Sequence, residues 1–436
     1  MPTLVRTTND RPERASGAGA LAAWCIYDFG IAAWPVVIAT FVWGVYFSTG
    51  IARSSDEGAA RWGVALSIAG FAVAILGPIL GAIADRAGRH KPWIGAFAAV
   101  CIAATACLWF SRPTPDVAGR TLVLVVIGSV SYEFGVVFYN ASLRDVAPQA
   151  MLGRVSGWGW GLGYIGGLGC LAIALFGLIK PTPALFGLDK AAAEPVRATA
   201  LLVALWIAVF VTPFFLLMPD RKSRDASIAQ AVGAGLRGLY ANLKDLPSRP
   251  AIFRFLIARM IYGDGLNTLF IFGGIYAAGV MGFALDEVLL FGIAINATAG
   301  LGAALFAWVD DWMGSKPTIV VSLLCSIALG TAILFIHSKA WFWPVGLALG
   351  VFVGPAQAAS RTLMARLVPL GLEAEMFGLY ALTGKITAFA GPAIYGLAVD
   401  HFASQRAGMA SVIVFLLIGL GLLMTVRAEG IKPVSA

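Results

Sequence analysis

The stretch Gly81-Ala-Ile-Ala-Asp-Arg-Ala-Gly-Arg-His-Lys91 is a short charged turn between two long apolar runs. The runs cover about 62–84 and 93–111, and about 20 helical residues span the ~30 Å hydrocarbon core of a bilayer. The charged side chains of the turn are therefore expected at a membrane surface. These side chains are Asp85, Arg86, Arg89 and Lys91.

A related turn, Asp310-Asp311-Trp-Met-Gly314-Ser-Lys316, also lies between two apolar runs. Two copies of one charged turn indicate a duplicated helical bundle in lipid.

Composition supports a membrane protein. The chain has 436 residues, of which 59% are hydrophobic and 12% charged, with a mean hydropathy of +0.84. Soluble domains carry about 25% charged residues. The net charge of +8 fits basic cytoplasmic loops better than nucleic-acid binding.

No sequence feature predicts an enzyme, a metal site or a cofactor. The five cysteines lie in apolar runs without paired or metal-ligand spacing, so no disulfide is expected. His90, His337 and His401 are unclustered and expected in loops, and no phosphate-binding Gly-rich loop is present.

Apolar runs recur along the whole chain and predict twelve membrane-spanning helices. They cover roughly 21–48, 62–84, 93–111, 120–141, 156–179, 199–218, 252–279, 287–308, 317–336, 341–361, 377–399 and 409–426.

The basic residues orient the chain, because cytoplasmic loops are enriched in Lys and Arg. Most of the 31 basic residues fall on one side when both termini are cytoplasmic. The polar N-terminus lacks a cleavable signal pattern and is interpreted as a tail. Segment 219–251 is the most basic loop and contains Gly233–Tyr240, which can form an amphipathic surface helix. The predicted parts are a tail at 1–20, a bundle at 21–218, a linker at 219–251, a bundle at 252–427 and a tail at 428–436.

Further matched positions support duplication. Pro148, Gly157 and Gly163 have the spacing of Pro369, Gly378 and Gly384, and Tyr27-Asp-Phe-Gly30 matches Tyr262-Gly-Asp-Gly265 in its Tyr and Gly. An all-α membrane protein with two pseudo-symmetric six-helix bundles is therefore predicted.

The Gly81–Lys91 turn resembles the signature that follows helix 2 in the major facilitator superfamily, and the Asp310 turn resembles its second copy. Four other segments resemble the vacuole-effluxer-like branch, which includes the autophagy-related amino-acid effluxers. They are Trp24–Trp34, Tyr139–Leu143, Tyr262–Leu269 and Gln357–Tyr380. Gly263 departs from the Asn that is common before the Asp of helix 7. The resemblance implies the major facilitator fold and secondary active transport, with amino acids as one substrate class.

Charges within the spans require a reason, since each costs about 2.5–3.5 kcal/mol on insertion scales. The resemblance places Asp28, Glu133 and Asp264 on helices that line the central cavity. They are interpreted as proton-coupling or substrate groups. The alternatives are fixed ion pairs that hold helices together, or polar helix caps near unwound glycines. Lys385 is expected to bind a substrate carboxylate or a counter-ion, and Arg259 either to join them or to extend to the cytoplasmic surface.

Arg361 is expected either at the cavity mouth or paired with Glu373 or Glu375. Other polar and aromatic side chains are expected to line the cavity, with helix packing or the membrane interface as the alternative for the aromatics. These candidates are Trp24, Tyr27, Trp34, Tyr139, Asn140, Asn267, Asn296 and Gln357.

The two charged turns are expected to form a cytoplasmic gate that closes in the outward-open state. Its candidate members are Asp85, Arg86, Arg89, Lys91, Arg144, Asp145, Asp310 and Asp311. Seven glycines between Gly157 and Gly169 predict a close interface between the halves. Gly77-Pro78 and Gly391-Pro392 are expected kink points.

These features predict a monomeric, multi-pass inner-membrane transporter. It moves a small polar solute, such as an amino acid, by alternating access coupled to protons. Its expected partners are the solute, protons and the lipid bilayer, without a cofactor or nucleic acid. The alternatives are a non-transporting transceptor or anchoring protein, or a transporter of lipids or sugars.

Overall fold

The computed structural model describes residues 17–220 and 228–427, without the side chains of 228–231 and Leu285. The predicted tail residues 1–16 and 428–436 lie outside the described residues, as do Arg221, Lys222 and Arg224 of the linker.

The described residues form twelve spans, eleven as helical runs long and apolar enough to cross a membrane and one as a broken pair of helices, which confirms the predicted number. The first span runs from Ala18 to Ile51 and combines α1 (Ala18–Ile31), π-helical turns and α2 (Trp43–Tyr46). The next five are built on α3 (Ser55–Ala87), α4 (Lys91–Cys107), α5 (Ala118–Ala141) with the short α6 (Leu143–Val146), α7 (Leu152–Ala172) and α8 (Glu194–Leu217). After α9 (Ile228–Asp245) follow α10 (Pro250–Gly279), α11 (Leu285–Met313), α12 (Ser315–Phe335), α13 (Lys339–Leu367), α14 (Glu373–Ile386), α15 (Ala390–Phe402) and α16 (Gln405–Met424).

The eleventh span corrects the sequence prediction, because it is two helices and not one continuous run. α14 ends at Ile386 and α15 begins at Ala390. Pro392 lies in the first turn of α15, where backbone N–H groups have no partner within the helix. It therefore lies in the start of a new helix and does not kink a continuous one.

The ends of α3 explain how the charged turn forms. The Ser54 side chain accepts a hydrogen bond from the Glu57 amide, and Asp56 and Glu57 occupy the positive end of the helix. At the other end Gly88 adopts φ 80°, a left-handed conformation that suits glycine at a helix C-terminus. The turn is thus shorter than predicted, and Asp85 and Arg86 belong to the last turn of α3.

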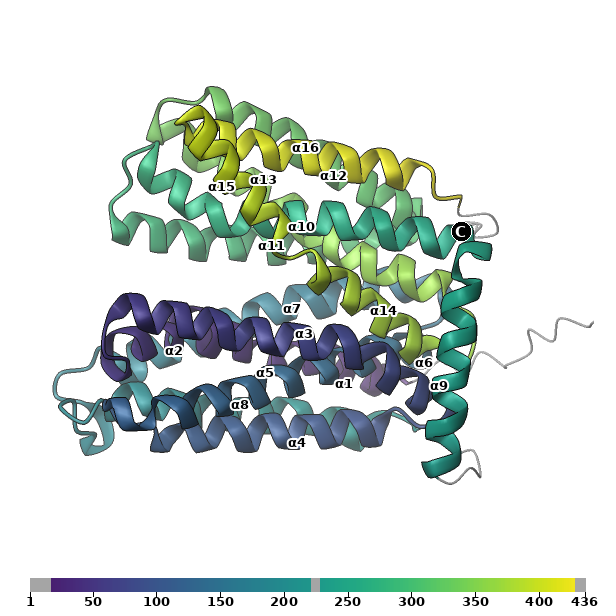
Figure 1. Cartoon of the computed structure of the whole chain (residues 1–436), viewed down its shortest axis with the longest axis horizontal. Helices are drawn as coiled ribbons and strands as arrows, with labels where there is room; N and C mark the ends of the chain where they lie inside the picture. The colour runs from purple at the N-terminus through teal and green to yellow at the C-terminus, as the bar shows by residue number, and fades with distance from the viewer. Residues whose placement is uncertain (1–16, 221–227, 428–436) are drawn as a thin grey trace, which may run out of the picture.

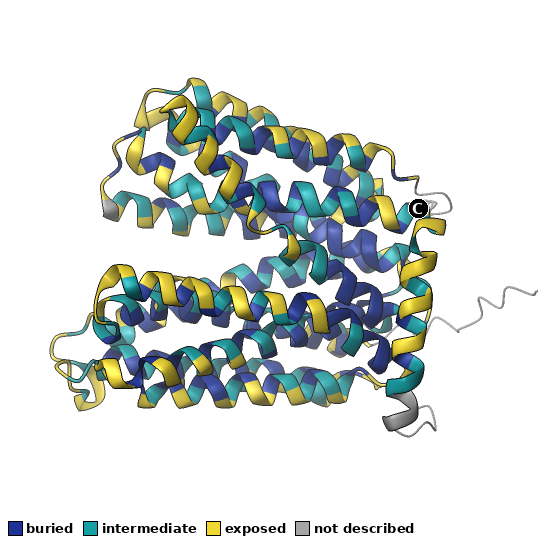
Figure 2. Cartoon of the chain, in the orientation of Figure 1, coloured by how far each residue is buried: buried dark blue, intermediate teal, exposed yellow. Residues whose placement is uncertain are grey.

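The spans form two bundles, α1–α8 and α10–α16, that lie side by side (Figure 1). They meet at the end of the molecule where α9 lies and separate toward the other end. We call these ends the linker side and the far side. Buried residues concentrate where the bundles meet, whereas exposed residues are common near the far side (Figure 2).

Small residues bring the two bundles together. Gly77 of α3 faces Gly378 of α14, and a side chain at Gly81 would collide with the carbonyl of Ala374. In a second contact between the bundles, Gly157 of α7 packs against Ala307 of α11. This confirms the predicted close packing of the glycine-rich helix. α3 continues through Pro78, and its neighbour Gly77 serves a close helix contact.

Candidate functional site

Three layers of polar contacts cross between the bundles, and the first is nearest the linker side. The Asp85 carboxylate accepts hydrogen bonds from the backbone amides of Ala374 at 3.1 Å and Glu375 at 2.8 Å. These amides belong to the first turn of α14, where a carboxylate is favoured by the helix dipole. His90 Nε2 lies 2.9 Å from the same carboxylate. A carboxylate of one bundle therefore caps a helix of the other.

The second charged turn makes the reciprocal contact. Asp311 of α11 accepts hydrogen bonds from the amides of Gly153 at 2.8 Å and Arg154 at 3.1 Å, in the first turn of α7. Its partners also include the side chains of Arg154 and Arg366. Arg366 pairs with Asp310 at 3.1 Å, and Asp310 accepts from Ser315 Oγ. The two halves thus cap each other's helices.

The other candidate gate residues lie at the same end. Arg89 forms an ion pair with Asp220, and Lys91 donates to the Met218 carbonyl. Arg144 donates across the bundles to the Val368 carbonyl at 2.6 Å. Arg86 lies against Gly238 of α9, and Asp145 lies on α6.

The second layer is centred on Arg361. Its Nη1 lies 2.9 Å from Asp28 Oδ2 and 3.2 Å from Asn140 Oδ1, and its Nη2 donates to the Ser156 carbonyl at 2.6 Å. The guanidinium also lies 4.8 Å from the ring centre of Trp24. Asp28 is therefore its partner, whereas Glu375 accepts from Asn242. This rules out one of the two alternatives expected for Arg361, its pairing with Glu373 or Glu375.

The third layer joins Glu133 of α5 to Lys385 of α14, with Nζ 2.6 Å from Oε1. The carboxylates of the three layers become more exposed toward the far side. The side chains of Asp85, Asp28 and Glu133 are 1%, 16% and 22% exposed, and Lys385 is 33% exposed. The Glu133–Lys385 pair is thus the crossing contact that is most open to solvent among these three.

Arg259 lies beside the third layer. Its guanidinium stacks 3.6 Å from the ring centre of Tyr380 and donates to the Tyr380 carbonyl and Thr383 Oγ1. It therefore contacts α14 and does not extend to the linker-side surface. A pocket of about 40 Å³ adjoins it. Among the residues that line this pocket are Arg259, Tyr262, Asn267, Gln357 and Gly384.

Asp264 lies apart from these layers, at the break between α14 and α15. Its Oδ2 accepts a hydrogen bond from the Gly391 amide at 2.7 Å, in the first turn of α15. Its Oδ1 is buried and has no hydrogen-bond partner among the described residues. A side chain at Gly391 would collide with Thr268 Oγ1. Asp264 therefore caps the second half of the broken helix within its own bundle.

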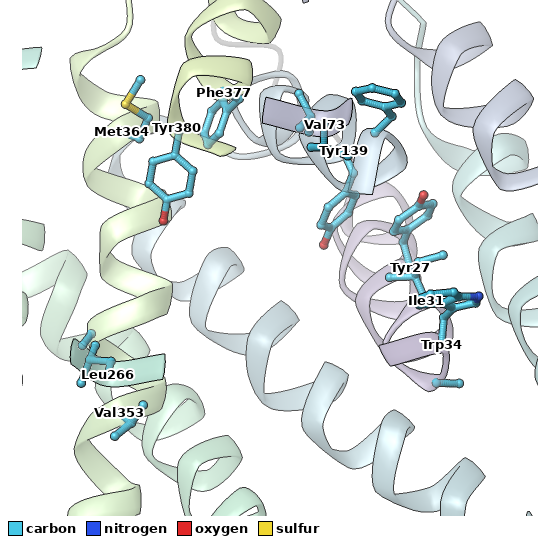
Figure 3. Close-up of a cluster of buried hydrophobic side chains, with 14 of the residues drawn as sticks. Tyr27, Ile31, Trp34, Val73, Tyr139, Leu266, Val353, Met364, Phe377 and Tyr380 are labelled. Atoms are coloured by element: carbon cyan, nitrogen blue, oxygen red, sulfur yellow. The ribbon is translucent and has the colours of Figure 1, made fainter. Parts of the chain in front are cut away.

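The aromatic candidates pack inside the N-terminal bundle. Tyr139 stacks between Trp24 and Tyr27, with ring centres 4.3 and 4.5 Å away, and Trp34 stacks on Tyr132. Figure 3 shows Tyr27 and Tyr139 on one bundle and Tyr380 and Leu266 on the other. The rings of Trp24, Tyr27 and Tyr139 are fully buried. Those of Trp24 and Tyr139 lie against the Arg361 guanidinium.

Asn296 is not brought to these layers, since its amide donates to the Gly292 carbonyl on its own helix. Among the described histidines, His401 lies in the last turn of α15 and not in the predicted loop. Sequence reasoning missed Ser156 and Tyr380, which hold the two arginines. Tyr380 belongs to a segment noted for its resemblance, whereas no pattern marks Ser156.

Comparison with known proteins agrees with this architecture. Residues 64–432 match the family model described as "Vacuole effluxer Atg22 like". The chain is 26% identical over 417 residues to the uncharacterized MFS-type transporter YxiO of Bacillus subtilis, across 95% of this chain and 96% of that one. It is 25% identical to autophagy-related protein 22 of Cryptococcus neoformans, but spans only about half of that protein (53%).

Solved structures with this fold are also transporters. The MFS transporter FucP in the outward conformation aligns with a TM-score of 0.74 at 11% identity, over 93% of this chain and 98% of that chain. The human organic anion transporter MFSD10 aligns with a TM-score of 0.70 at 14% identity, over 95% and 100%. The fold is that of a major facilitator transporter and not of an enzyme, and the chain belongs to the vacuole effluxer Atg22-like family.

Proposed function

We propose that the chain carries a small zwitterionic solute, an amino acid, across the inner membrane by alternating access coupled to protons. It acts as a monomer, with the linker side and both termini in the cytoplasm. The observation that carries the proposal is the set of opposite charges around the third layer. Lys385 and Arg259 supply cations beside one turn of α14, and Glu133 supplies an anion from the other bundle.

These charges match the two ends of an amino acid. A solute carboxylate can replace Glu133 as the partner of Lys385, and the solute ammonium can then pair with Glu133. Each buried charge keeps a partner during this exchange, which avoids the cost of leaving it unpaired. The amide and hydroxyl groups of Asn267, Gln357 and Ser360 near Arg259 add hydrogen-bonding capacity.

Asp264 is the proposed proton carrier. One carboxylate oxygen binds the Gly391 amide, and the other is buried without a hydrogen-bond partner in the described part of the chain. Protonation of the free oxygen neutralises a buried charge and weakens the cap on α15. A proton on Asp264 would thereby change the start of a half-helix in the bundle that also holds Arg259 and Lys385.

The closed linker side supports assignment of this structure to the outward-facing state. The three crossing layers must separate before a bound solute can reach the cytoplasm. The exposed third layer is the first that a solute entering from the far side would meet. Solute binding at this level and proton binding at Asp264 can then shift the balance between states.

The test is uptake of radiolabelled amino acids into proteoliposomes, with and without an inward proton gradient. We expect gradient-driven uptake by the wild type, none by Glu133→Gln, and loss of gradient dependence in Asp264→Asn. Glu57→Gln is the matched control, because Glu57 forms an exposed pair with Arg61 away from the crossing layers. It should transport like the wild type.

Each failure has a separate meaning. Uptake that does not depend on the proton gradient would refute proton coupling and indicate facilitated diffusion. Flux of sugars or lipids without amino-acid flux would refute the zwitterion assignment. Binding of a solute without any flux would favour the transceptor alternative. The apolar pocket among α10, α11, α12, α13 and α16 lends little support to lipid transport, since its volume is about 30 Å³.

A further inference from the structure

Helix α9 has a position unlike that of the spanning helices. It runs across their linker-side ends, at a steep angle to the bundles, from the N-terminal bundle toward the start of α10 (Figure 1). The ends of the spans fix the level of the bilayer surface, so α9 lies at that level and close to its plane.

One face of α9 is fixed to the protein and bridges both bundles. Gly235 lies against the backbone of Ile83 in α3, and Leu239 on the same face is buried. Asn242 donates hydrogen bonds to both carboxylate oxygens of Glu375 in α14, at 3.0 and 3.2 Å. These residues follow the three- and four-residue spacing of one helical face.

A second face is apolar and exposed. Leu236, Tyr240 and Leu243 are 45%, 73% and 43% exposed and follow the same spacing, so they form one stripe. Single exposed apolar residues are ordinary, but a continuous stripe on a helix at the bilayer surface is typical of interfacial helices.

The edge next to this stripe is basic. Arg237 and Lys244 are exposed, and each follows a residue of the stripe by one position, about 100° further around the helix. Beyond the end of α9, Arg249, Arg254 and Arg427 line a hollow of about 610 Å³. The buried Nη1 of Arg249 has no hydrogen-bond partner in the described ranges. This surface complements negative charge.

We propose that α9 binds the surface of an anionic phospholipid bilayer and thereby holds the linker side closed. Leu236, Tyr240 and Leu243 insert at the level of the headgroups, and Arg237 and Lys244 bind anionic lipids. Because the adjoining face of α9, about 100° around the helix from the stripe, contacts both α3 and α14, a helix held on the membrane also holds the Asp85 contact closed. The inference does not depend on which solute is transported.

The test uses the full-length protein in nanodiscs of phosphatidylcholine alone or with phosphatidylglycerol, in a background with Cys107→Ser and Cys325→Ser. The environment-sensitive dye NBD is attached at Tyr240→Cys to report insertion. In a separate protein, Ala358→Cys reports opening, because Ala358 is buried at the contact between α7 and α13. The charge variant is Arg237→Gln/Lys244→Gln, and the matched control is Arg53→Gln/Arg61→Gln, two exposed basic residues near the far side.

We expect blue-shifted NBD emission, and slower alkylation of the Ala358→Cys protein, in anionic nanodiscs than in neutral ones. The charge variant should weaken the affinity of α9 for anionic lipid, measured from the NBD emission, about 30-fold. Each basic residue near an anionic surface contributes roughly fivefold to this affinity. High salt should weaken it as well. The control variant should respond like its parent.

Two results would overturn the proposal. Emission that stays water-like in every bilayer would mean that the stripe faces water or another protein. A blue shift without any change in the alkylation rate would mean that α9 binds the membrane but does not hold the linker side closed.

Discussion

Helices α1 and α10 occupy matching places in the two halves, yet their carboxylates have different partners. The segments Tyr27-Asp-Phe-Gly30 and Tyr262-Gly-Asp-Gly265 differ by one position in where the Asp stands. One residue rotates a side chain by about 100° around a helix. Asp28 thereby reaches Arg361 in the other bundle, whereas Asp264 caps α15 in its own bundle. A carboxylate that pairs with the other bundle should control opening of the linker side. A carboxylate that caps a helix of its own bundle should mainly control the stability of that helix.

The largest effect is expected for Asp28→Asn. It leaves Arg361 buried without its ionic partner, at a cost of about 3 kcal/mol, the lower end of the range for broken buried pairs because Asn140 and Ser156 still accept hydrogen bonds. Closure should weaken about 100-fold, measured as faster alkylation of Ala358→Cys. The double variant Asp28→Asn/Arg361→Gln should recover part of this loss, and strict additivity would argue against coupling.

A smaller effect is expected for Gly391→Ala. The new methyl group would collide with Thr268 Oγ1 and should destabilise the C-terminal bundle by about 2 kcal/mol. Thermal unfolding in detergent measures it. Gly396→Ala is the matched control in the same helix, because nothing lies within 4 Å of its added Cβ. Equal unfolding temperatures for the two variants would contradict the close contact at Gly391.

Asp85→Asn tests the other crossing carboxylate. It removes the charge from a group that accepts two backbone amides of α14, and should weaken closure by about 1–2 kcal/mol. The protein should shift toward the inward-open state, again measured at Ala358→Cys. An unchanged alkylation rate would remove Asp85 from the gate.

The smallest effect is expected for Asp264→Ala, where loss of the cap should cost about 1 kcal/mol. Hydrogen exchange should accelerate at the first amides of α15, those of Ala390, Gly391 and Ala393, with a much smaller increase in the alkylation of Ala358→Cys than Asp28→Asn causes. Alkylation of Ala358→Cys that is as fast in this variant as in Asp28→Asn would refute the distinction between crossing and local carboxylates.

The sequence was sufficient for the twelve spans and the two copies of the charged turn, since apolar length and charge placement follow directly from the cost of polar groups in lipid. It identified Asp28 and Arg361 separately but not as partners, because 333 positions separate them and the pairing depends on how the bundles dock. Ser156 gave no signal for the same reason.

The break in the eleventh span also escaped prediction. Gly391-Pro392 marks the correct region, but the helix ends earlier, at Ile386. The group that stabilises the new helix start is Asp264, which comes from another helix. Local sequence shows that a helix can begin at this point, whereas only the tertiary fold supplies the acceptor that makes it begin.

The backbone contact between Gly77 and Gly378 gives the molecule a fulcrum. Asp85 lies eight residues further along α3, about 12 Å from this contact. A rotation of about 15° around the glycines would move Asp85 by about 3 Å, which exceeds the tolerance of its hydrogen bonds to α14. A small rotation at a contact between glycines is thus enough to break the Asp85 hydrogen bonds at the membrane surface.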